Sequence, residues 1–301
     1  MSSGPSATLV RHRVWHKMVN EWLDRALPGE HTPPRRVHAA MRFAVLGGGK
    51  RLRPHLSLEV ARCLDVDIHV ALPVAGCIEL LHASSLVFDD LPSMDDDSMR
   101  RGRPSTHAAY GEATAILAGT ALLVATFEHV AASSPSHGAA LVLEFARAAG
   151  TRGLVGGQAR DLFPIDEPEP SWVVRTHAEK TGSLFGLACA APAILAGRDA
   201  ADVDALRAAG VNLGIAFQIA DDVADRTSTF ERLGKAPGSD ARQGRASLPS
   251  VESLEGAEAR AREHLGAALD EIERVSGARP SLQWVASLFR GAEPDLNGAA
   301  G

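Results

Sequence analysis

Apolar residues recur at helical spacing along nearly the whole chain, and this pattern is the strongest constraint on the fold. Alanine and leucine are abundant, β-branched residues are scattered, and the apolar positions do not alternate as they would in strands. Early in the chain the spacing is carried by Val14, Met18, Trp22 and Leu23, and late in the chain by Leu254, Ala257, Ala261, Leu265, Leu269 and Ile272. The pattern predicts an all-α, single-domain bundle of about ten or more helices.

Short breaks rich in Gly, Pro or Ser divide this pattern into separate helices. Between the first and last helices we expect others near 35–46, 54–64, 71–91, 106–132, 137–162, 171–197 and 202–225. Residues 226–248 are the one long polar segment, and loops of this length are often functional. No linker-like composition divides the chain, so we expect one domain over 1–301 with flexible tails at 1–12 and 292–301.

Composition narrows the class of protein. The chain has 301 residues, of which 45% are hydrophobic and 23% charged, which is enough to bury a substantial core. A net charge of −6 offers no basic field, so we expect no nucleic-acid partner. Cys63, Cys77 and Cys189 form no CxxC pair, which favours reduced thiols in the cytoplasm. No stretch approaches ~20 uncharged residues, so we expect no stable membrane insertion.

Five aspartates lie within nine residues in FDDLPSMDDDS. Asp89 and Asp95 are six positions apart, which is about 240° around an ideal helix, so they can converge only if the helix is interrupted. Pro92 supplies a reason for that interruption, because it lacks an amide hydrogen and clashes with the carbonyl four residues before it. A break at Pro92 could bring Asp95 beside Asp89.

A second acidic group lies in FQIADDVADR, where Asp221 and Asp225 share one helix face. Carboxylates without nearby His or Cys suit a hard cation, and Mg²⁺ uses few protein carboxylates and completes its shell with water and substrate phosphate. The alternative for either group alone is a solvated helix end. An EF-hand is disfavoured because the DxDxDG spacing is missing.

Three bases follow three glycines in VLGGGKRLRPHL: Lys50, Arg51 and Arg53. Glycine lets the backbone approach an anion, and the bases offer charge-assisted hydrogen bonds to phosphate oxygens. The stretch is not a Walker A loop, since Ala44 and Arg51 stand where Gly and Ser or Thr are required. Further candidates are Arg100, Arg101, Lys180, Thr181 and Lys235. Each alone could be a surface charge or part of a helix cap, but together they predict two anion sites.

Five ordered motifs carry a resemblance to a known family. The motifs are GGGKRLRP, LLHASSLVFDDLPSMDDDSMRRGRPSTH, LVGGQARDL, EKTGSLF and FQIADDVAD. Their order and approximate spacing resemble those of the trans-polyprenyl diphosphate synthases, and the chain resembles that family from about residue 38 to 290. Within that family the chain is most similar to bacterial geranylgeranyl diphosphate synthases of the carotenoid-pathway type. The resemblance implies an all-α bundle around a deep cavity, normally assembled as a homodimer.

The resemblance also implies roles for particular residues. Asp89, Asp95 and Asp221 would bind up to three Mg²⁺ ions, with support from Asp90, Asp222 and Asp225. The allylic diphosphate would be lined by Arg100, Lys180, Gln218 and Lys235, with Thr181 beside Lys180, and isopentenyl diphosphate would be held by Lys50, Arg53, His82 and Arg101. Metals and bases would neutralise the leaving diphosphate, so Asp89, Asp95, Asp221, Lys180 and Arg100 would be catalytic. The alternative for His82 is a satisfied core histidine.

Product length would depend on small residues one turn before the first aspartate pair. In the resemblance, Ser84 and Ser85 admit a twenty-carbon product, whereas bulky aromatic residues there stop at fifteen. The alternative is that Ser84 is an ordinary helix-packing residue. The chain also departs from the family pattern at Phe88, where many members carry His, at Thr120, where Asp is common, and at Arg245, where Lys is usual.

We therefore expect a Mg²⁺-dependent enzyme that condenses allylic diphosphates with isopentenyl diphosphate and forms geranylgeranyl diphosphate. A farnesyl or longer-chain synthase is an open alternative. GGGKRLRP argues against a terpene cyclase, which needs no second diphosphate site. A non-catalytic partner subunit is the alternative from another class, although such a protein should have lost aspartates that this chain keeps.

Overall fold

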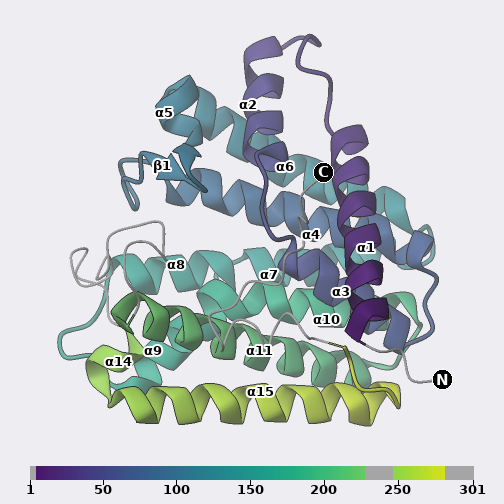
Figure 1. The fold of residues 1–301 in the computed structure, drawn as a ribbon. Coiled ribbons are helices and arrows are strands. Elements are labelled where there is room, and N and C mark those ends of the chain that lie inside the picture. Colours follow the sequence, from purple (N-terminus) through teal and green to yellow (C-terminus); the bar gives the residue numbers. More distant parts are fainter. Residues whose placement is uncertain (1–4, 228–246, 282–301) are drawn as a thin grey trace. The chain divides into compact units, whose positions relative to one another are not determined.

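The computed structural model describes residues 5–227 and 247–281, which are almost entirely helical (Figure 1). These residues group into two compact units with the boundary between Val142 and Leu143. The all-α prediction is confirmed. The expectation of one domain over the whole chain stays a prediction, and each unit is described below by itself.

The first unit contains most of the N-terminal helices and one small hairpin. Its elements are α1 (Pro5–Ala26), α2 (Arg35–Leu46), α3 (Leu52–Cys63), α4 (Ile68–Asp89), β1 (Met99–Arg100), β2 (Arg103–Pro104), α5 (Thr106–Tyr110) and α6 (Glu112–Ser133). Helix α7 (Gly138–Ala149) crosses the boundary. The second unit contains α8 (Leu154–Leu162), α9 (Pro170–His177), the π-helix η1 (Ala178–Gly182), α10 (Ser183–Leu195), α11 (Ala200–Thr227), α14 (Leu248–Val251) and α15 (Leu254–Ser276).

Three predicted helices are divided in the structure. Gly111, at φ 83°, separates α5 from α6 within the predicted helix 106–132. The predicted helix 137–162 is interrupted between α7 and α8, where Gly150 and Gly153 lie, and 171–197 contains the π-helical turn. Most of the predicted loop 226–248 lies outside the described residues, and α11 continues to Thr227.

The expected N-terminal tail differs from the structure, because α1 begins at Pro5. Thr8 and His12 are both buried, and with Trp15, Val19 and Leu23 they form one continuous inner stripe of the helix. The stripe begins with two polar residues, which is why a search for apolar spacing places the start of the helix too late.

Helix α4 is the central helix of the first unit and is buried over most of its length. Its Gly76 lies against the ring of Trp22 from α1, where a Cβ would collide with the ring. Two helices of the described chain, α4 and α6, are long and apolar enough to cross a membrane, with mean hydropathy of 1.7 and 1.6. For α4 the core explains this composition, since 72% of its apolar window is buried; for α6 only 33% is.

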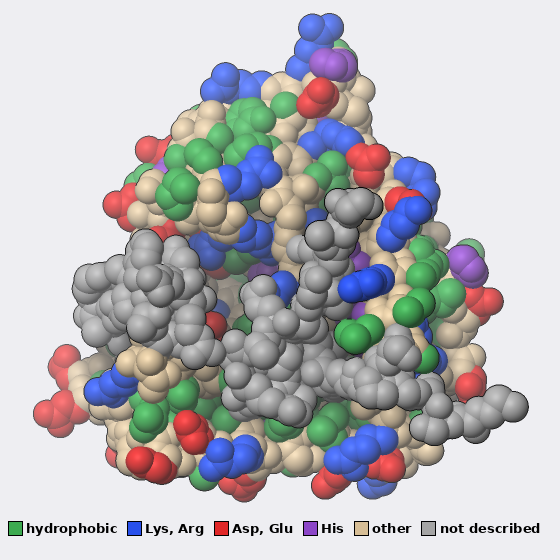
Figure 2. Space-filling view, viewed as in Figure 1, with side chains coloured by type: hydrophobic (Ala, Val, Ile, Leu, Met, Phe, Trp, Pro, Cys, Tyr) green, Lys and Arg blue, Asp and Glu red, His purple; other side chains and the backbone are tan. Residues whose placement is uncertain are grey.

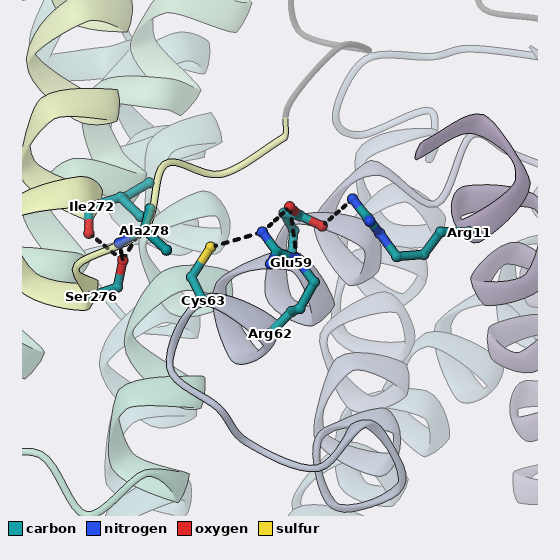
Figure 3. Close-up of polar contacts among 7 residues, drawn as sticks. All are labelled: Arg11, Glu59, Arg62, Cys63, Ile272, Ser276 and Ala278. Atoms are coloured by element: carbon teal, nitrogen blue, oxygen red, sulfur yellow. Dashed lines mark hydrogen bonds and ion pairs between the residues drawn. The ribbon is translucent and has the colours of Figure 1, made fainter. Parts of the chain in front are cut away.

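In the second unit α11 packs between α10 and α15, and α15 runs along it (Figure 1). Gly210 and Gly214 of α11 face the backbone of Phe185 and Gly182, and a Cβ at either glycine would clash. The side chain of Ser253 caps the start of α15 by accepting a bond from the Gly256 amide at 3.0 Å. Figure 3 shows Ser276 closing its other end, with its hydroxyl donating to the Ile272 and Ala278 carbonyls at 2.7 and 2.9 Å.

Buried charges in the first unit are paired. Glu59 of α3 is fully buried and accepts bonds from Arg62 at 2.8 Å and Arg11 at 3.3 Å (Figure 3). All three cysteines lie in the described residues, where each is buried and none forms a disulfide. On the face drawn in Figure 2, basic and acidic side chains are interspersed rather than gathered by sign.

Three histidines form a buried cluster between α1 and α3. The ring of His55 lies 5.5 Å from that of His12 and 5.6 Å from that of His16, measured between centroids. Both ring nitrogens of His55, one of His12 and one of His16 have no hydrogen-bond partner. Burial, followed by the neighbouring His12, His16 and Arg51, lowers the pKa of His55 to about 3. Burial also lowers the pKa of His12, with a smaller raising effect of Glu59 and lowering effect of Arg11. Burial likewise lowers the pKa of His16, which Arg51 lowers further and Glu79 raises.

This cluster predicts a loss of stability in mild acid. His55 is neutral in the folded protein but takes up a proton near pH 6.5 when unfolded, so its contribution is present above pH 6.5 and falls as the pH drops below that value. We expect the free energy of unfolding to fall by about 2 kcal/mol between pH 7.5 and 5 through His55 alone. Urea unfolding at both values, with His55→Leu as the comparison, measures this. An equal loss in the two proteins would contradict the assignment.

Candidate functional site

The first acidic cluster follows the end of α4, which terminates at Asp89, three residues before Pro92. The amide of Asp95 donates to the carbonyl of Asp89 at 2.9 Å, so the chain turns back after the helix. The amides of Met94 and Asp96 both donate to Leu91, at 2.8 and 3.1 Å, which closes the turn. The backbone of Asp95 therefore returns to Asp89, as the interruption at Pro92 predicts.

Asp90 differs from the other aspartates of the cluster because it is buried, and it is paired with Arg100. Nε of Arg100 donates to Oδ1 of Asp90 at 2.9 Å, a second guanidinium nitrogen bonds the same oxygen, and Asp97 lies 3.3 Å from Arg100. Burial raises the pKa of Asp90 despite the lowering effect of Arg100. Asp90 thus orients the Arg100 guanidinium at the C-terminal end of α4.

Among the three bases after the glycines, Arg51 has a structural role. It lies 2.7 Å from Glu79, and both side chains are 2% exposed. Arg51 also donates to the side chain of Asn20 at 3.0 Å and to the carbonyl of Val45 at 2.8 Å. The expectation that Arg51 offers its charge to phosphate, together with Lys50 and Arg53, is corrected by these contacts, which use its guanidinium inside the protein.

Arg53 and His82 do meet, as their shared assignment to one diphosphate requires. Nη1 of Arg53 lies 3.1 Å from Nε2 of His82, and since arginine can only donate, the histidine nitrogen accepts. Burial lowers the pKa of Arg53 to about 10, which leaves it charged at neutral pH. Lys50 is exposed at the start of this segment.

His82 is surrounded by arginines as well as being partly removed from water. Burial lowers its pKa well below the ordinary value, and four arginines, at positions 53, 101, 100 and 51, lower it further. A neutral imidazole held among several guanidinium groups marks a concentration of positive charge. A polyanion would be stabilised there.

A small cleft in the first unit lies beside these arginines. Its lining residues are Phe43, Ala44, Gly47, Ala83, Leu86, Val87, Asp90, Arg100, Arg101, Arg103, Pro104, Ser105 and Thr106. The lining combines apolar side chains of α2 and α4 with the basic hairpin formed by β1 and β2.

In the second unit, the acidic group at the end of α11 is divided between two environments. Asp221 is exposed, whereas Asp222 and Asp225 are buried. Oδ1 of Asp222 accepts a bond from Gln218 at 3.1 Å, and its Oδ2 accepts one from the Leu248 amide at 3.0 Å and lies 3.3 Å from His177. Asp222 therefore connects α11 to α9 and α14. The sequence predicts only a supporting role at the metal for Asp222 and does not predict this structural contact.

Gln218 and Thr181 are also brought together, since the hydroxyl of Thr181 donates to the Gln218 side chain at 2.9 Å. Lys180 lies in the π-helical turn, and its Nζ is 2.5 Å from Asp161 of α8. Gly157 allows this approach, because a Cβ there would lie 2.1 Å from the Lys180 amide nitrogen. Asp161 and His177 received no role from the sequence, although Asp161 lies inside the motif LVGGQARDL.

The acidic residues fit a magnesium ion that arrives with its substrate. Their donors are all carboxylate oxygens, the ligands that Mg²⁺ prefers. Within residues 5–227 and 247–281, no group of three or more His, Cys, Asp or Glu could hold a metal by itself. Since Mg²⁺ is often bound by one or two carboxylates plus phosphate, the missing ligands would come from the diphosphate and water. Lys235 and Arg245 lie outside the described residues.

Comparison with known proteins decides the family. Residues 34–279 match the polyprenyl synthetase family. The chain belongs to this family. The resemblance found in the five motifs is confirmed at that level, and the chain is a member of a family of prenyltransferases.

Individual relatives show how far the likeness extends. The chain is 39% identical to the heterodimeric geranylgeranyl pyrophosphate synthase large subunit 2 of Arabidopsis thaliana, over 79% of its own length and 64% of that relative's. It is 37% identical to the farnesyl diphosphate synthase of Geobacillus stearothermophilus, over 85% and 88% of the two chains. The crystal structure of geranylgeranyl pyrophosphate synthetase from Pyrococcus horikoshii matches with a TM-score of 0.78 at 30% identity, covering 94% and 95%. Relatives with different products are thus about equally similar.

Proposed function

We propose that this polyprenyl synthetase is a Mg²⁺-dependent prenyltransferase that condenses allylic diphosphates with isopentenyl diphosphate and forms geranylgeranyl diphosphate. The observation that carries the proposal is the contact between Arg53 and His82 at 3.1 Å, a few residues along α4 from the turn in which Asp95 returns to Asp89. Helix α4 and the turn after it thereby present groups for isopentenyl diphosphate and carboxylates for the metal of the allylic diphosphate. We place the protein in the cytoplasm, without stable insertion in a membrane.

In this mechanism Lys50, Arg53, His82 and Arg101 hold isopentenyl diphosphate, and Arg100, Lys180, Thr181, Gln218 and Lys235 hold the allylic diphosphate. Asp89, Asp95 and Asp221 would hold up to three Mg²⁺ ions, which would supply neutralising charge to the leaving diphosphate. The bases add to this stabilisation, so the allylic C–O bond breaks with both electrons passing to diphosphate. The double bond of isopentenyl diphosphate then forms the new C–C bond, and the proton it loses passes to the released diphosphate.

Two braces keep the bases in place for this reaction. Asp161 holds the Lys180 ammonium at 2.5 Å, and Asp90 holds the Arg100 guanidinium. Positioned charges stabilise an ionising bond more than mobile ones, because they need no reorganisation as charge develops. Asp222 and Asp225 are assigned to support Asp221 on α11. Asp222 does so through its bonds to neighbouring elements.

Turnover by the purified chain alone tests the proposal. With Mg²⁺, labelled isopentenyl diphosphate and each allylic primer in turn, chromatography of the dephosphorylated products should show a twenty-carbon alcohol. Chelation of divalent ions should abolish the product. A fifteen-carbon or longer product would favour the alternative synthases. Turnover that appears only after a second polypeptide is added would favour the partner-subunit hypothesis.

Product length gives a prediction in which the two serines differ. Ser84 is buried, and its hydroxyl donates to the Gly119 carbonyl of α6 at 2.9 Å, so it packs at a helix contact. Ser85 is half-buried and bonds only within its own helix, to the His82 carbonyl at 2.9 Å. We expect Ser85→Phe to shift the main product from twenty to fifteen carbons, since a ring one turn before Asp89 would fill the path of the growing tail.

Ser84→Phe serves as the comparison for this prediction. Its ring would press against the α6 backbone, so we expect thermal unfolding to occur at a lower temperature by several degrees, together with any shortening of the product. Chromatography of the products and a melting curve are needed for each variant. A stable, active Ser85→Phe enzyme that still makes the twenty-carbon product would contradict the assignment of Ser85.

The outer face of α6 supports the homodimer. Ile116, Leu117 and Val124 are 46%, 57% and 61% exposed along one side of this helix. A second copy of the chain would remove this apolar face from water. We expect Leu117→Glu to convert a dimer to a monomer in light scattering at micromolar concentration, whereas Val70→Glu, at an exposed apolar residue of α4, should leave the dimer intact. If the wild type is instead a monomer and sediments with lipid vesicles, the apolar face of α6 is a membrane-binding surface.

A further inference from the structure

The hairpin after the first acidic cluster positions two arginines, Arg101 and Arg103, in a defined way. Met99 pairs with Pro104 and Arg100 with Arg103, which leaves Arg101 and Gly102 as a two-residue turn. Both turn residues have positive φ, 53° and 73°, the conformation of the turn type that fits the twist of such hairpins. Arg101 accepts this conformation although it is not glycine.

Two of the hairpin arginines, Arg101 and Arg103, contact the loop of three glycines that precedes Lys50. The guanidinium of Arg101 donates to the Gly48 carbonyl, and a Cβ on Gly49 would lie 2.5 Å from Nη1 of the same arginine. A Cβ on Gly47 would lie 2.5 Å from Nη1 of Arg103. Gly47 and Gly49 therefore leave the space that the two guanidinium groups occupy.

Gly48 differs from its two neighbours. A Cβ there would meet nothing within 4 Å, but its φ of 98° is one that only glycine adopts without strain. At Gly47 the φ of −65° suits any residue, and the obstacles to a Cβ are the side chain of Arg103 at 2.5 Å and the backbone carbonyl oxygen of Phe43 at 2.9 Å. Gly47 and Gly49 are thus required for the space they leave, and Gly48 and Gly49 for their positive φ of 98° and 127°. The two requirements can be tested separately at Gly47 and Gly48.

Arg103 is held by packing. Its guanidinium carbon lies 3.8 Å from the centroid of the Phe43 ring, and Phe43 makes an edge contact with Tyr110 at 5.3 Å. Within the described residues Arg103 forms no ion pair with a carboxylate, unlike Arg100 in the same hairpin. A planar guanidinium can stack on a ring in this way, and a lysine cannot.

We propose that Arg103 is a positioning residue for the isopentenyl diphosphate site. Arg103 packs between Phe43 and Gly47 and thereby fixes the glycine loop against the hairpin. The positions of Lys50 and Arg53, which follow this loop, are fixed as a result. The inference rests on the proposed function for the identity of the ligand, but the mechanical role of Arg103 does not. Its loss should weaken binding of isopentenyl diphosphate and leave the ionisation step intact.

The kinetic test compares substitutions at Arg103. For Arg103→Ala we expect KM for isopentenyl diphosphate to rise roughly tenfold, with kcat and KM for the allylic substrate changed less than about twofold. Arg103→Lys keeps the charge but not the stacking plane, so it should resemble the alanine variant. Recovery of the wild-type KM by lysine, or an equal effect on kcat, would overturn the proposed role.

A double-mutant cycle isolates the contact itself. Gly47→Ala should raise KM for isopentenyl diphosphate in the wild type by roughly the same tenfold factor, because its methyl group displaces Arg103. In the Arg103→Ala background the factor should be clearly smaller, because only the contact with the Phe43 carbonyl oxygen remains. Gly48→Ala is the control, since its backbone strain is independent of Arg103 and its effect should multiply with that of Arg103→Ala. An equal effect of Gly47→Ala in both backgrounds would refute the contact.

Amide hydrogen exchange separates failure of this inference from failure of the proposed function. In the full chain without substrate, residues 47–53 should exchange about tenfold faster in Arg103→Ala than in the wild type. If the wild type shows no prenyl transfer but this change is seen, the proposed function fails and the positioning role stands. Unchanged exchange in the loop would overturn the positioning role whatever the activity.

Discussion

Asp89→Asn is expected to lower turnover by about 10²–10³-fold without changing the helical content. The substitution keeps the shape of the side chain and removes one negative oxygen, so an ion on which ionisation of the substrate depends would be held less well. Steady-state assays at saturating Mg²⁺, with circular dichroism on the same samples, measure the effect. Asp221→Asn, on α11, should behave in the same way.

Two matched controls lie beside these residues. Asp96 belongs to the same cluster but is assigned neither to a metal ion nor to a substrate, so Asp96→Asn should retain turnover within about threefold. Asp222 neighbours Asp221 but accepts bonds from Gln218 and Leu248, so Asp222→Asn should lower thermal stability as well as activity. Near-normal turnover by Asp89→Asn, or an equal loss in Asp96→Asn, would contradict the proposed metal ligands.

The largest effect on stability is expected for Glu79→Ala. Arg51 and Glu79 are both 2% exposed, and removal of the carboxylate leaves the Arg51 guanidinium buried without its counter-charge. Breaking such a pair destabilises a protein by about 3–5 kcal/mol. Urea unfolding followed by circular dichroism should show this loss, which would leave little of the stability of an ordinary domain.

An exposed ion pair provides the comparison for Glu79. Glu271 and Arg274 of α15 lie 2.7 Å apart at the surface, and pairs of this kind contribute about 0–1 kcal/mol. Glu271→Ala should therefore shift the unfolding transition only slightly. If the two substitutions lower the free energy of unfolding by the same amount, then the Arg51–Glu79 pair does not stabilise the protein as its burial indicates.

The helical class and several helices could be predicted from apolar spacing alone. The predicted helix 202–225 agrees with α11, and 35–46 agrees with α2 at both ends. The division at Gly111 could not be predicted in the same way, because a single glycine inside a helical pattern is tolerated and only its positive φ ends the helix. Where buried positions are polar, as at the start of α1, hydropathy carries no signal.

Within the candidate site, motifs identify residue types better than they identify contacts. Asp221 and Asp222 are adjacent in one motif, yet they point about 100° apart around α11, and Asp222 contacts Gln218, His177 and Leu248 inside the protein. Arg51 stands between two residues assigned to substrate but has its partner 28 positions away. Arg103 received no role, since its significance depends on Phe43 and Gly47, which the hairpin brings to it.

The central claim is that both acidic groups act on one diphosphate through divalent ions. Anomalous diffraction from crystals of the chain grown with Mn²⁺ and an unreactive thio analogue of an allylic diphosphate tests it most directly. The account predicts manganese ions that contact the diphosphate together with the carboxylates of Asp89 and Asp95 and of Asp221. A bound diphosphate without manganese, or manganese missing from either acidic group, would contradict it.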